Sequence, residues 1–405
     1  MLQYDVIISG GGMVGASLAC ALSGKGLRIA QLEAVELQTR SAPGYDDRAI
    51  ALAYGTRRIF EGLQLWDSLA AQATPIHHIH VSDRGRFGMV HMDRAEERLP
   101  ALGYVVPARV IGDVLSAAVR QIGELDSYCP ATVTSVSQAD EAINVNISHE
   151  GKTTTLSAAL LVAADGADSP LREQFGISHV ETDYRQTAIV TNITPQLAHN
   201  NIAYERFTDS GPMALLPMTE QRCAVVWTVD SSRVEEIMAL DDAAFLAALQ
   251  ERFGYRLGRL DRVGRRQAWP LRLVQAKESV RERLALIGNA IHTLHPVAGQ
   301  GFNLGARDVA VLAEVLVDAL QVGEDPGSLA VLGRYGDWRK RDHRNVAVFT
   351  DGLARMFTLP LPALGVARSV SMTAFDLLPP AKRLLTRLTM GRSGRAPRLV
   401  RGLPL

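Results

Sequence analysis

Runs in which nearly every residue is apolar occur at three places: Tyr4–Ser9, Ala159–Asp165 and Leu284–Gly288. Such continuous runs are typical of strands that are buried on both faces of a parallel sheet. The first run is followed by a glycine cluster, a helix-length segment of small residues and a second apolar run, Leu27–Glu33. Strand, turn, helix and strand form a βαβ unit, so the chain is predicted to open with a parallel sheet.

Two other segments, 76–99 and 181–269, alternate between apolar and polar positions with turns between them. Alternation with a period of two predicts antiparallel strands that have one buried face. These segments interrupt the first pattern, so they are expected to form a second domain inserted into the first. The apolar spacing in 302–322 and 328–350 predicts helices.

Composition and charge narrow the class of protein. The 405 residues are 47% hydrophobic and 21% charged with zero formal net charge, which suits two or three globular units and gives no case for nucleic-acid binding. The three cysteines lie far apart, which argues against a disulfide framework or a structural zinc. The start of the chain does not resemble a signal peptide, and no apolar stretch reaches the roughly 18 residues of a membrane span. We therefore expect a cytoplasmic protein.

A first motif follows the first apolar run. Gly10, Gly12 and Gly15 form G-x-G-x-x-G between a predicted strand and a predicted helix, and Glu33 ends the next strand, 23 residues after Gly10. This pattern suits a dinucleotide whose pyrophosphate lies at a helix N-terminus and whose ribose bonds to an acid about 20 residues further on. A glycine-rich turn of any α/β protein would not require that acid. The motif predicts a Rossmann-like domain but does not separate NAD from FAD.

Two further motifs follow buried strands. In "LLVAADGADSPLR" the strand ends at Asp165 and Gly166, and Ser169 with Pro170 suits the start of a helix. "ALIGNAIHTLHPVAGQGFNLGARD" (285–308) combines a turn, two histidines, a proline and Gly-x-Gly ahead of a helix. By themselves these residue types suit a metal site, a phosphate site or a flavin site.

Together the three motifs resemble those of the flavin-dependent aromatic hydroxylases, which are single-component FAD monooxygenases, over about residues 4–345. "DDRAIALAYGT" (46–56), "ERFTDSGPMALLPM" (205–218) and "HPVAGQGFNLGARD" (295–308) are similar to the ubiquinone-biosynthesis branch, whose nearest members hydroxylate a polyprenylated methoxyphenol. Asn289 stands where the family usually has aspartate, a substitution associated with the same branch. An amide there can still accept a hydrogen bond, but it lacks the negative charge.

The resemblance implies the fold, the cofactors and most of the site. It implies an FAD-binding domain formed by residues 1–75, 100–180 and 270–345, an antiparallel substrate domain formed by 76–99 and 181–269, and a helical C-terminal region, 346–405. FAD is the expected cofactor and NAD(P)H the transient reductant. Besides Gly10, Gly12, Gly15 and Glu33, the expected FAD contacts are Arg48, Arg109, Asp165, Gly166, Gly288, Asn289, Gly299, Gln300, Gly301, Phe302 and Asn303.

The reactive part of the site is harder to assign. By resemblance, Pro296 walls the reactive edge of the flavin, and His295 is a candidate to face the substrate. His292 is expected to make a structural hydrogen bond. A metal site is not expected, because no cysteine or carboxylate lies at the usual ligand spacing from the two histidines. The substrate wall is expected at Tyr204, Arg206 and 213–217, where an ordinary core strand is the alternative. No residue is assigned as catalytic base.

The C-terminal region differs from the rest in charge. From Gly352 onward it has nine Lys or Arg and one acid, whereas the remainder has 34 basic and 42 acidic residues. In 381–390 three leucines share one helical face and basic residues lie beside them, a pattern typical of an interfacial helix. We expect contact with the inner face of the membrane or with a biosynthetic complex; the alternative is a helix packed on the domain. Residues 391–405 are expected to be flexible.

These inferences predict a monooxygenase that uses NAD(P)H and O2 to hydroxylate a prenylated phenol through a flavin hydroperoxide. Two alternatives keep the flavin: a reductase or epoxidase of isoprenoid lipids, and a non-catalytic flavin-bound subunit of a biosynthetic complex.

Overall fold

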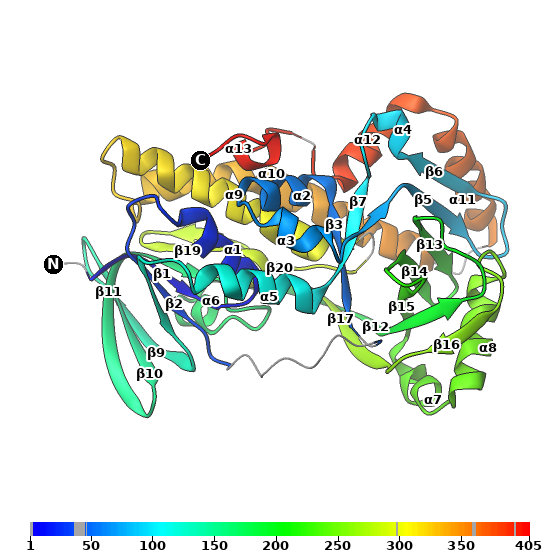
Figure 1. Cartoon of the computed structure of the whole chain (residues 1–405), viewed down its shortest axis with the longest axis horizontal. Coiled ribbons are helices and arrows are strands. Elements are labelled where there is room, and N and C mark those ends of the chain that lie inside the picture. Colours follow the sequence, from blue (N-terminus) through cyan, green and yellow to red (C-terminus); the bar gives the residue numbers. More distant parts are fainter. Residues whose placement is uncertain (1–2, 36–44, 46, 297–298, 359–361, 393) are drawn as a thin grey trace.

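A computed structural model describes residues 3–35, 45, 47–296, 299–358, 362–392 and 394–405, with the side chains of 354–368 excepted. Figure 1 shows two regions side by side, each built on a β-sheet. Two long helices, α9 (Gln300–Gln321) and α10 (Leu329–Thr358), begin in the first region, and α10 extends toward the second.

The first sheet is mostly parallel in its centre. Its order is β18-β19-β11-β1-β2-β8, and β1 pairs in parallel with both β2 and β11, as the βαβ pattern predicts. The long strand β11 also pairs with β10, which pairs with β9, so an antiparallel extension projects from the sheet. Its strands are β1 (Tyr4–Ser9), β2 (Ile29–Leu32), β8 (Leu125–Tyr128), β9 (Ala131–Gln138), β10 (Ile143–His149), β11 (Lys152–Ala163), β18 (Val280–Arg281) and β19 (Leu284–Leu286).

Helices α1 (Met13–Leu22), α5 (Ala108–Val119) and α9 cover one face of this sheet and form its largest apolar core. Strands β9 and β10 and the short helix α6 (Pro170–Gln174) contribute to the core on the other face. The apolar runs of β1, β11 and β19 are buried because both faces are covered.

The second sheet is almost entirely antiparallel, with the order β20-β17-β12-β15-β14-β13-β5-β6 and β16 beside β12. Helices α7 (Val234–Met238) and α8 (Asp242–Phe253) follow β15 and the 3-10 turn η1 (Ser231–Arg233), and residues of both join the apolar core on one face of this sheet. Its strands are β5 (His78–Asp83), β6 (Met89–Asp93), β12 (His179–Pro195), β13 (Ile202–Thr208), β14 (Gly211–Pro217), β15 (Cys223–Asp230), β16 (Leu260–Val263), β17 (Gln267–Ala276) and β20 (His292–Thr293).

The predicted fold class is therefore confirmed: a Rossmann-like α/β domain with a parallel sheet, an antiparallel sheet and a helical C-terminal region. The exact domain limits stay a prediction. The antiparallel sheet includes β20 and the end of β17, which lie in the segment 270–345 expected in the first domain. A small three-stranded sheet, β3 (Ala49–Ala53), β7 (Gly103–Pro107) and β4 (Thr74–Ile76), leads into helix α2 (Tyr54–Gly62). Two further helices are α3 (Trp66–Ala70) and α4 (Arg94–Glu97).

The C-terminal region continues from α10 into α11 (Pro362–Asp376), α12 (Pro379–Thr389) and α13 (Arg398–Arg401). Helix α12 confirms the helix predicted for residues 381–390. None of the helices in the described residues is both long enough and apolar enough to cross a membrane.

The expectation that residues 391–405 are flexible does not hold for Arg398–Val400, which pack on the domain. Leu399 and Val400 are buried against Ile59 of α2, and Arg398 pairs with Glu314 and Asp318 of α9. The segment is held because two apolar side chains fill a space beside α2 while the adjacent arginine meets acids. A helix of one turn is too short to produce a detectable period.

Candidate active site

The turn between β1 and α1 leaves an open space at a helix N-terminus. Gly10 has φ +112°, and a side chain there would collide with the carbonyl oxygen of Ala164. A side chain at Gly15 would collide with the carbonyl oxygen of Gly10, whereas nothing lies within 4 Å of a Cβ added at Gly12. No side chain caps α1. Its first N–H groups can therefore bind an anion such as a pyrophosphate.

Glu33 lies beside this turn, as its spacing predicts. Its Oε2 accepts a hydrogen bond from the Gly11 N–H at 2.7 Å, and Oε1 accepts from the Val35 N–H at 2.9 Å. The two backbone donors orient the carboxylate at the end of β2. Each oxygen keeps a further lone pair for a ribose hydroxyl.

The second motif, Asp165–Arg172, follows β11, and a hydrogen bond connects it to the third motif. Gly166 has φ +95° and lines a large cavity, and burial raises the pKa of the neighbouring Asp165. Ser169 caps α6 as predicted, accepting from the Arg172 N–H at 3.0 Å. The Arg172 side chain is buried and donates to the carbonyl of Ala290 at 3.1 Å. It therefore holds the turn of the third motif instead of facing the cavity.

The third motif begins with the 3-10 turn η2 (Gly288–Ala290), packed against α1. Gly288 has φ +60°, and an added Cβ would lie 3.1 Å from Val14. Gly305 of α9 is equally close to Val14, at 3.0 Å. Glycines 288 and 305 thus let the turn and α9 approach the first helix, so motifs almost 300 residues apart form one surface.

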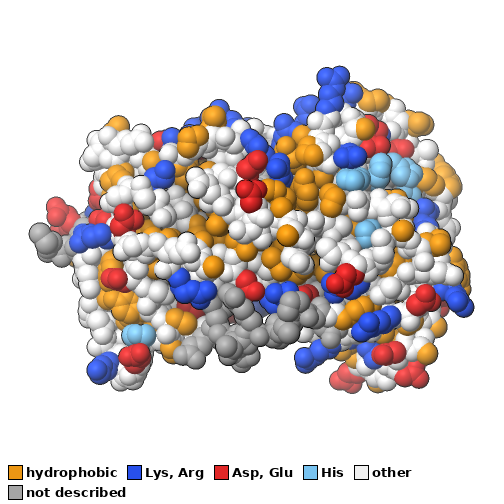
Figure 2. Space-filling view, viewed as in Figure 1, with side chains coloured by type: hydrophobic (Ala, Val, Ile, Leu, Met, Phe, Trp, Pro, Cys, Tyr) orange, Lys and Arg blue, Asp and Glu red, His pale blue; other side chains and the backbone are white. Residues whose placement is uncertain are grey.

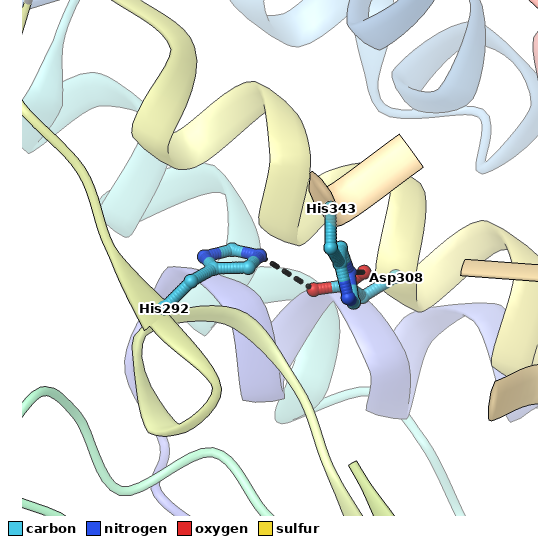
Figure 3. Close-up of side chains that lie close together, drawn as sticks. All are labelled: His292, Asp308 and His343. Carbon is cyan, nitrogen blue, oxygen red and sulfur yellow. Dashed lines mark hydrogen bonds and ion pairs between the residues drawn. The ribbon is translucent and has the colours of Figure 1, made fainter. Parts of the chain in front are cut away.

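A buried ion cluster anchors this turn (Figure 3). Asp308 of α9 is fully buried, and its Oδ2 accepts from the Gly288 N–H at 3.0 Å. Its Oδ1 accepts from Arg339 Nε at 2.7 Å and His343 Nε2 at 2.6 Å, both on α10. His292 Nε2 lies 3.4 Å from Oδ2, in line with the structural role expected of it. Burial alone would raise the pKa of Asp308, but His343 and Arg339 hold it well below its ordinary value.

His292, Asp308 and His343 bring together atoms that could ligate a metal ion. The arrangement does not favour a cation, because both carboxylate oxygens already accept hydrogen bonds and a guanidinium lies 2.7 Å from one of them. Burial also lowers the pKa of His343 to about 4, so its ring is neutral at pH 7. The cluster serves instead to fix η2 between α9 and α10.

The start of α9 forms a second open helix N-terminus. Gly299 has a left-handed conformation with φ +60°, and no side chain caps the helix. Gln300, Gly301 and Phe302 line the cavity, and nothing lies within 4 Å of a Cβ added at Gly301. Such a terminus stabilises negative charge by roughly 0.3–1 kcal/mol, and by more where it is partly buried.

Asn303 lies in the first turn of α9, but its side chain is saturated. Oδ1 accepts from the Ala53 N–H at 2.8 Å and the Thr56 hydroxyl at 2.7 Å. Nδ2 donates to the carbonyls of Ala51 at 2.8 Å and Gly299 at 2.7 Å. All four hydrogen-bonding positions of the amide are used. Asn303 therefore clamps β3 to the helix start, and only its backbone remains to meet a ligand.

Three residues of the predicted reactive loop have different surroundings. Pro296 and the exposed Asn289 line the cavity. His295, expected to face the substrate, is instead buried away from the lining, with its ring packed edge-on against Tyr184 at 5.1 Å. Burial lowers the pKa of His295 to about 4. A neutral ring beneath the loop suits support of Pro296 better than substrate contact.

The two arginines expected at FAD also differ. Arg48 lines the cavity and lies 5.9 Å above the Trp269 ring. Arg109 is not among the lining residues, because its guanidinium pairs with Asp47 at 3.1 Å and Asp113 at 3.4 Å. Its direct contact with FAD stays a prediction; the structure shows Arg109 holding the residue before Arg48.

All of these openings meet in one cavity of about 2370 Å³. Ordinary ligand sites measure roughly 300–1,000 Å³, so there is room for a dinucleotide and a second ligand. One part is lined by the glycine turns and Arg48. The other is mainly apolar, with walls from β5, β6, α10, α11 and α12, including Ile79, Val81, Val90, Met92, Phe349, Met372, Phe375, Leu385 and Leu388.

The segments expected to form the substrate wall line the cavity only in part. Tyr204 touches the cavity, but its ring packs against Phe253 at 5.4 Å, and Met213 and Leu215 belong to the same core beneath the sheet. Of the alternate positions, Glu205, Phe207, Ala214 and Leu216 line the cavity. Arg206 pairs with Met213 in register and is not among the lining residues. Side chains alternate between faces along a strand, so a shift of one position reverses the assignment.

Glu205 is a residue that sequence reasoning missed. It brings a carboxylate to the apolar part of the cavity. The signal in the sequence is that Glu205 is the charged residue between Ala203 and Phe207, which lie at alternate positions of the same strand. Among the three histidines at 77, 78 and 80, where a solvated turn is expected from the sequence, His80 is instead buried, and its Nδ1 lies 2.7 Å from His91 Nε2.

The sequence matches the profile of a family described as FAD binding domain over residues 3–348. It is 38% identical to the ubiquinone hydroxylase UbiL of Rhodospirillum rubrum, covering 99% of this chain and 93% of that protein. It is 30% identical to the 3-demethoxyubiquinol 3-hydroxylase of Escherichia coli, covering 96% and 98%. Among solved structures, the p-nitrophenol 4-monooxygenase PnpA of Pseudomonas putida superposes with a TM-score of 0.79 at 20% identity, over 96% of this chain and 98% of that one.

Proposed function

Because the chain belongs to the FAD-binding-domain family and is an FAD-dependent monooxygenase, we propose that it hydroxylates the aromatic ring of a polyprenylated methoxyphenol in ubiquinone biosynthesis. The observation that carries the proposal is the single cavity that joins two open helix N-termini to an apolar channel. Its two parts suit a dinucleotide and a prenyl chain.

The residues present fit FAD. The open space at Gly12 and the uncapped start of α1 suit the pyrophosphate, and Glu33 suits the ribose. Gly166, Asn289 and Gly299–Phe302 line the next part of the cavity, where the ribityl chain and the ring would lie. When bound, FAD would accept two electrons from NAD(P)H and activate O2, so that one oxygen atom enters the phenol ring and the other leaves as water.

The chain itself supplies position, charge stabilisation and exclusion of water. The uncapped N–H groups at the start of α9 would stabilise the negative charge that bound FAD carries after reduction. Pro296 forms a rigid side of the pocket, and the apolar residues beyond it keep bulk water from the reacting atoms. The cluster around Asp308 contributes indirectly, by holding Gly288 in place.

We assign Glu205 as the acceptor for the hydroxyl group of the phenol. Glu205 lies on β13 and adds a carboxylate to the apolar part of the cavity, which Phe207 of the same strand also lines. A carboxylate that accepts the phenol proton would orient the ring and raise its electron density. Glu205→Gln should keep FAD bound, raise KM and lower kcat for the phenol, and shift the pH profile of kcat. Unchanged kinetics would remove the assignment.

The apolar channel and α12 together favour a substrate drawn from a membrane. Leu384 of α12 lines the cavity and is 68% exposed, so the channel reaches the surface beside this helix. Figure 2 shows Lys and Arg side chains next to a patch of hydrophobic ones in the area where Figure 1 draws α12. Apolar contact flanked by basic residues is the pattern of an interfacial helix, and each basic residue adds about 1 kcal/mol near an anionic surface.

The test is product identification. Protein reconstituted with FAD is incubated with NADPH or NADH, a prenylated methoxyphenol in detergent and ¹⁸O2. We expect a product with one labelled oxygen on the ring and stoichiometric oxidation of the nicotinamide. Labelled oxygen in the prenyl chain would indicate an epoxidase. Reduced substrate without labelled oxygen would indicate a reductase, and no turnover with any reductant would favour a flavin-bound structural subunit.

A further inference from the structure

The cavity extends beyond the start of α9 into a groove whose arginine-lined end the proposed reaction does not use. One wall is a face of α10, where residues spaced three or four apart turn the same way: Arg334, Trp338, Arg341, Asn345 and Val348. The opposite wall is the segment after α12, with Gly391 and 394–397 lining the groove. This segment is anchored by α13, so the groove has two fixed sides.

Arg307 of α9 forms the floor of this groove. Its side chain is only 6% exposed, and Nε donates to Asp342 Oδ2 at 2.9 Å. Nη1 and Nη2 are buried and have no hydrogen-bond partner among the residues that the structure describes. A buried charged donor without a partner costs several kcal/mol, so these two nitrogens call for an anionic oxygen.

The residue opposite Arg307 is a glycine in a left-handed conformation. Gly391 has φ +68°, and a Cβ added there would lie 2.6 Å from Arg307 Nη1. The absence of a side chain lets the guanidinium reach the wall of the groove. The position of Arg307 therefore depends on Gly391.

The groove carries a net positive charge. Its lining contains six arginines, at 307, 334, 339, 341, 344 and 395, and two aspartates, at 337 and 342. Arg339 also pairs with Asp308 and Arg334 with Glu324, so the six arginines exceed the four nearby acids by two. Arg395 is fixed by stacking 3.7 Å above the Trp338 ring, whose Nε1 donates to the Arg395 carbonyl at 2.9 Å.

The groove becomes apolar at its other end. Val348 of α10 is 67% exposed and lines the cavity with Leu384 and Leu388 of α12. A free phosphate would use only the arginine end, and a nucleotide would leave the leucines unused. A ligand with a phosphate at one end and hydrocarbon at the other uses both.

We propose that this groove binds one anionic phospholipid, with its phosphate between Arg307, Arg341 and Arg395 and an acyl chain between α10 and α12. The proposal rests on the membrane contact of the proposed function but not on the identity of the phenol. A bound lipid would hold α12 at the bilayer beside the mouth of the channel.

The test is flotation with phosphatidylcholine vesicles that contain or lack phosphatidylglycerol, using FAD-loaded protein. Wild type should bind the anionic vesicles more tightly, and Arg307→Gln should lose about tenfold of that preference, equivalent to about 1.4 kcal/mol. Gly391→Ala displaces the guanidinium without changing net charge and should show a similar loss. The matched control is Arg383→Gln, which removes an exposed charge on α12 and should lose about fivefold or less. FAD content checks folding of each variant.

Three results would overturn the proposal. One is that Arg307→Gln and Gly391→Ala both prefer anionic vesicles as strongly as the wild type does. Another is a loss in Arg383→Gln as large as in Arg307→Gln, which would indicate diffuse attraction. The third is stabilisation of wild type, but not Arg307→Gln, by inorganic phosphate at constant ionic strength without any effect of vesicle composition. If wild type binds no vesicles yet hydroxylates a short-chain phenol, the lipid site fails while the proposed reaction stands.

Discussion

The two parts of the cavity are built by different means. The dinucleotide part uses backbone N–H groups at two helix starts, and its shape depends on glycines at which a side chain would collide with backbone or a packed valine. The channel part uses apolar side chains from two sheets and three helices, and many similar side chains would serve. Backbone recognition needs particular residues at particular positions, whereas an apolar wall needs only volume and the correct face.

The largest effect is expected where a side chain has no space. Gly15→Ala places a methyl group against the Gly10 carbonyl, so α1 must move away from the turn, and we expect loss of FAD binding. The matched control is Gly112→Ala, also within a helix but with nothing within 4 Å, which should be neutral or stabilising by up to about 1 kcal/mol. Flavin absorbance after reconstitution measures both. FAD bound normally by Gly15→Ala would break the comparison.

The ion cluster beneath the turn should come next. Asp308→Asn removes the fully buried one of the two carboxylates that pair with Arg339, and we expect a loss of about 3–5 kcal/mol in unfolding free energy. Asp342→Asn, at a partly exposed position that also pairs with Arg339, should cost less. Urea unfolding of the two proteins gives the difference. Equal losses of unfolding free energy in the two variants would show that the hydrogen bond from the Gly288 N–H to Asp308 adds nothing to stability.

Two buried histidines, His343 of this cluster and His295 beside Pro296, predict a dependence of stability on pH. The rings of His343 and His295 stay neutral in the fold to about pH 4, because burial lowers their pKa, while in the unfolded chain they titrate near 6.5. The unfolded state binds more protons in this window. Unfolding free energy should therefore fall as pH drops from 6.5 to 4, by up to about 1.4 kcal/mol per pH unit for each ring. Urea titrations should show a shallower slope for His343→Gln, and an unchanged slope would contradict the assignment.

A smaller effect is expected in the channel. Ala214→Phe adds volume on the face of β14 that lines the cavity, and it should raise KM for a prenylated phenol about tenfold while FAD affinity stays unchanged. The control is Ala247→Phe, an exposed position of α8, the helix that packs on the other side of the same sheet. Steady-state kinetics would show no change for the control. Weakened FAD binding in Ala214→Phe would mean that the two parts are not separable.

The smallest effect concerns the exposed Asn289 of the third motif. Asn289→Asp adds one negative charge beside the expected flavin, which should leave FAD bound and lower its reduction potential. An interaction of roughly 0.5–1 kcal/mol corresponds to about 10–20 mV for two electrons. Reductive titration against a reference dye measures the shift. An unchanged potential would mean that solvent screens this position.

The features of the fold and the site that could be predicted from the sequence differ from one part of the chain to another. The glycine turns, Glu33, the Ser169 cap and the strands of both sheets were predictable, because each follows from local spacing or from a backbone conformation. The roles of Arg172 and Asn303 were not, because their partners lie 118 and about 250 residues away. Of the two β13 residues expected at the substrate wall, Tyr204 touches the cavity and Arg206 does not. Alternation defines two faces but does not say which one is turned to the cavity.

The sequence by itself determined the family, the cofactor and the βαβ core, since these depend on glycines and on buried runs that only a few arrangements satisfy. The tertiary structure alone decided which groups face the ligands. It buried His295, saturated Asn303, turned Glu205 to the channel and laid the last residues over Arg307. The reason is physical: a backbone conformation is a local property, whereas the side of an element that becomes buried depends on what packs against it.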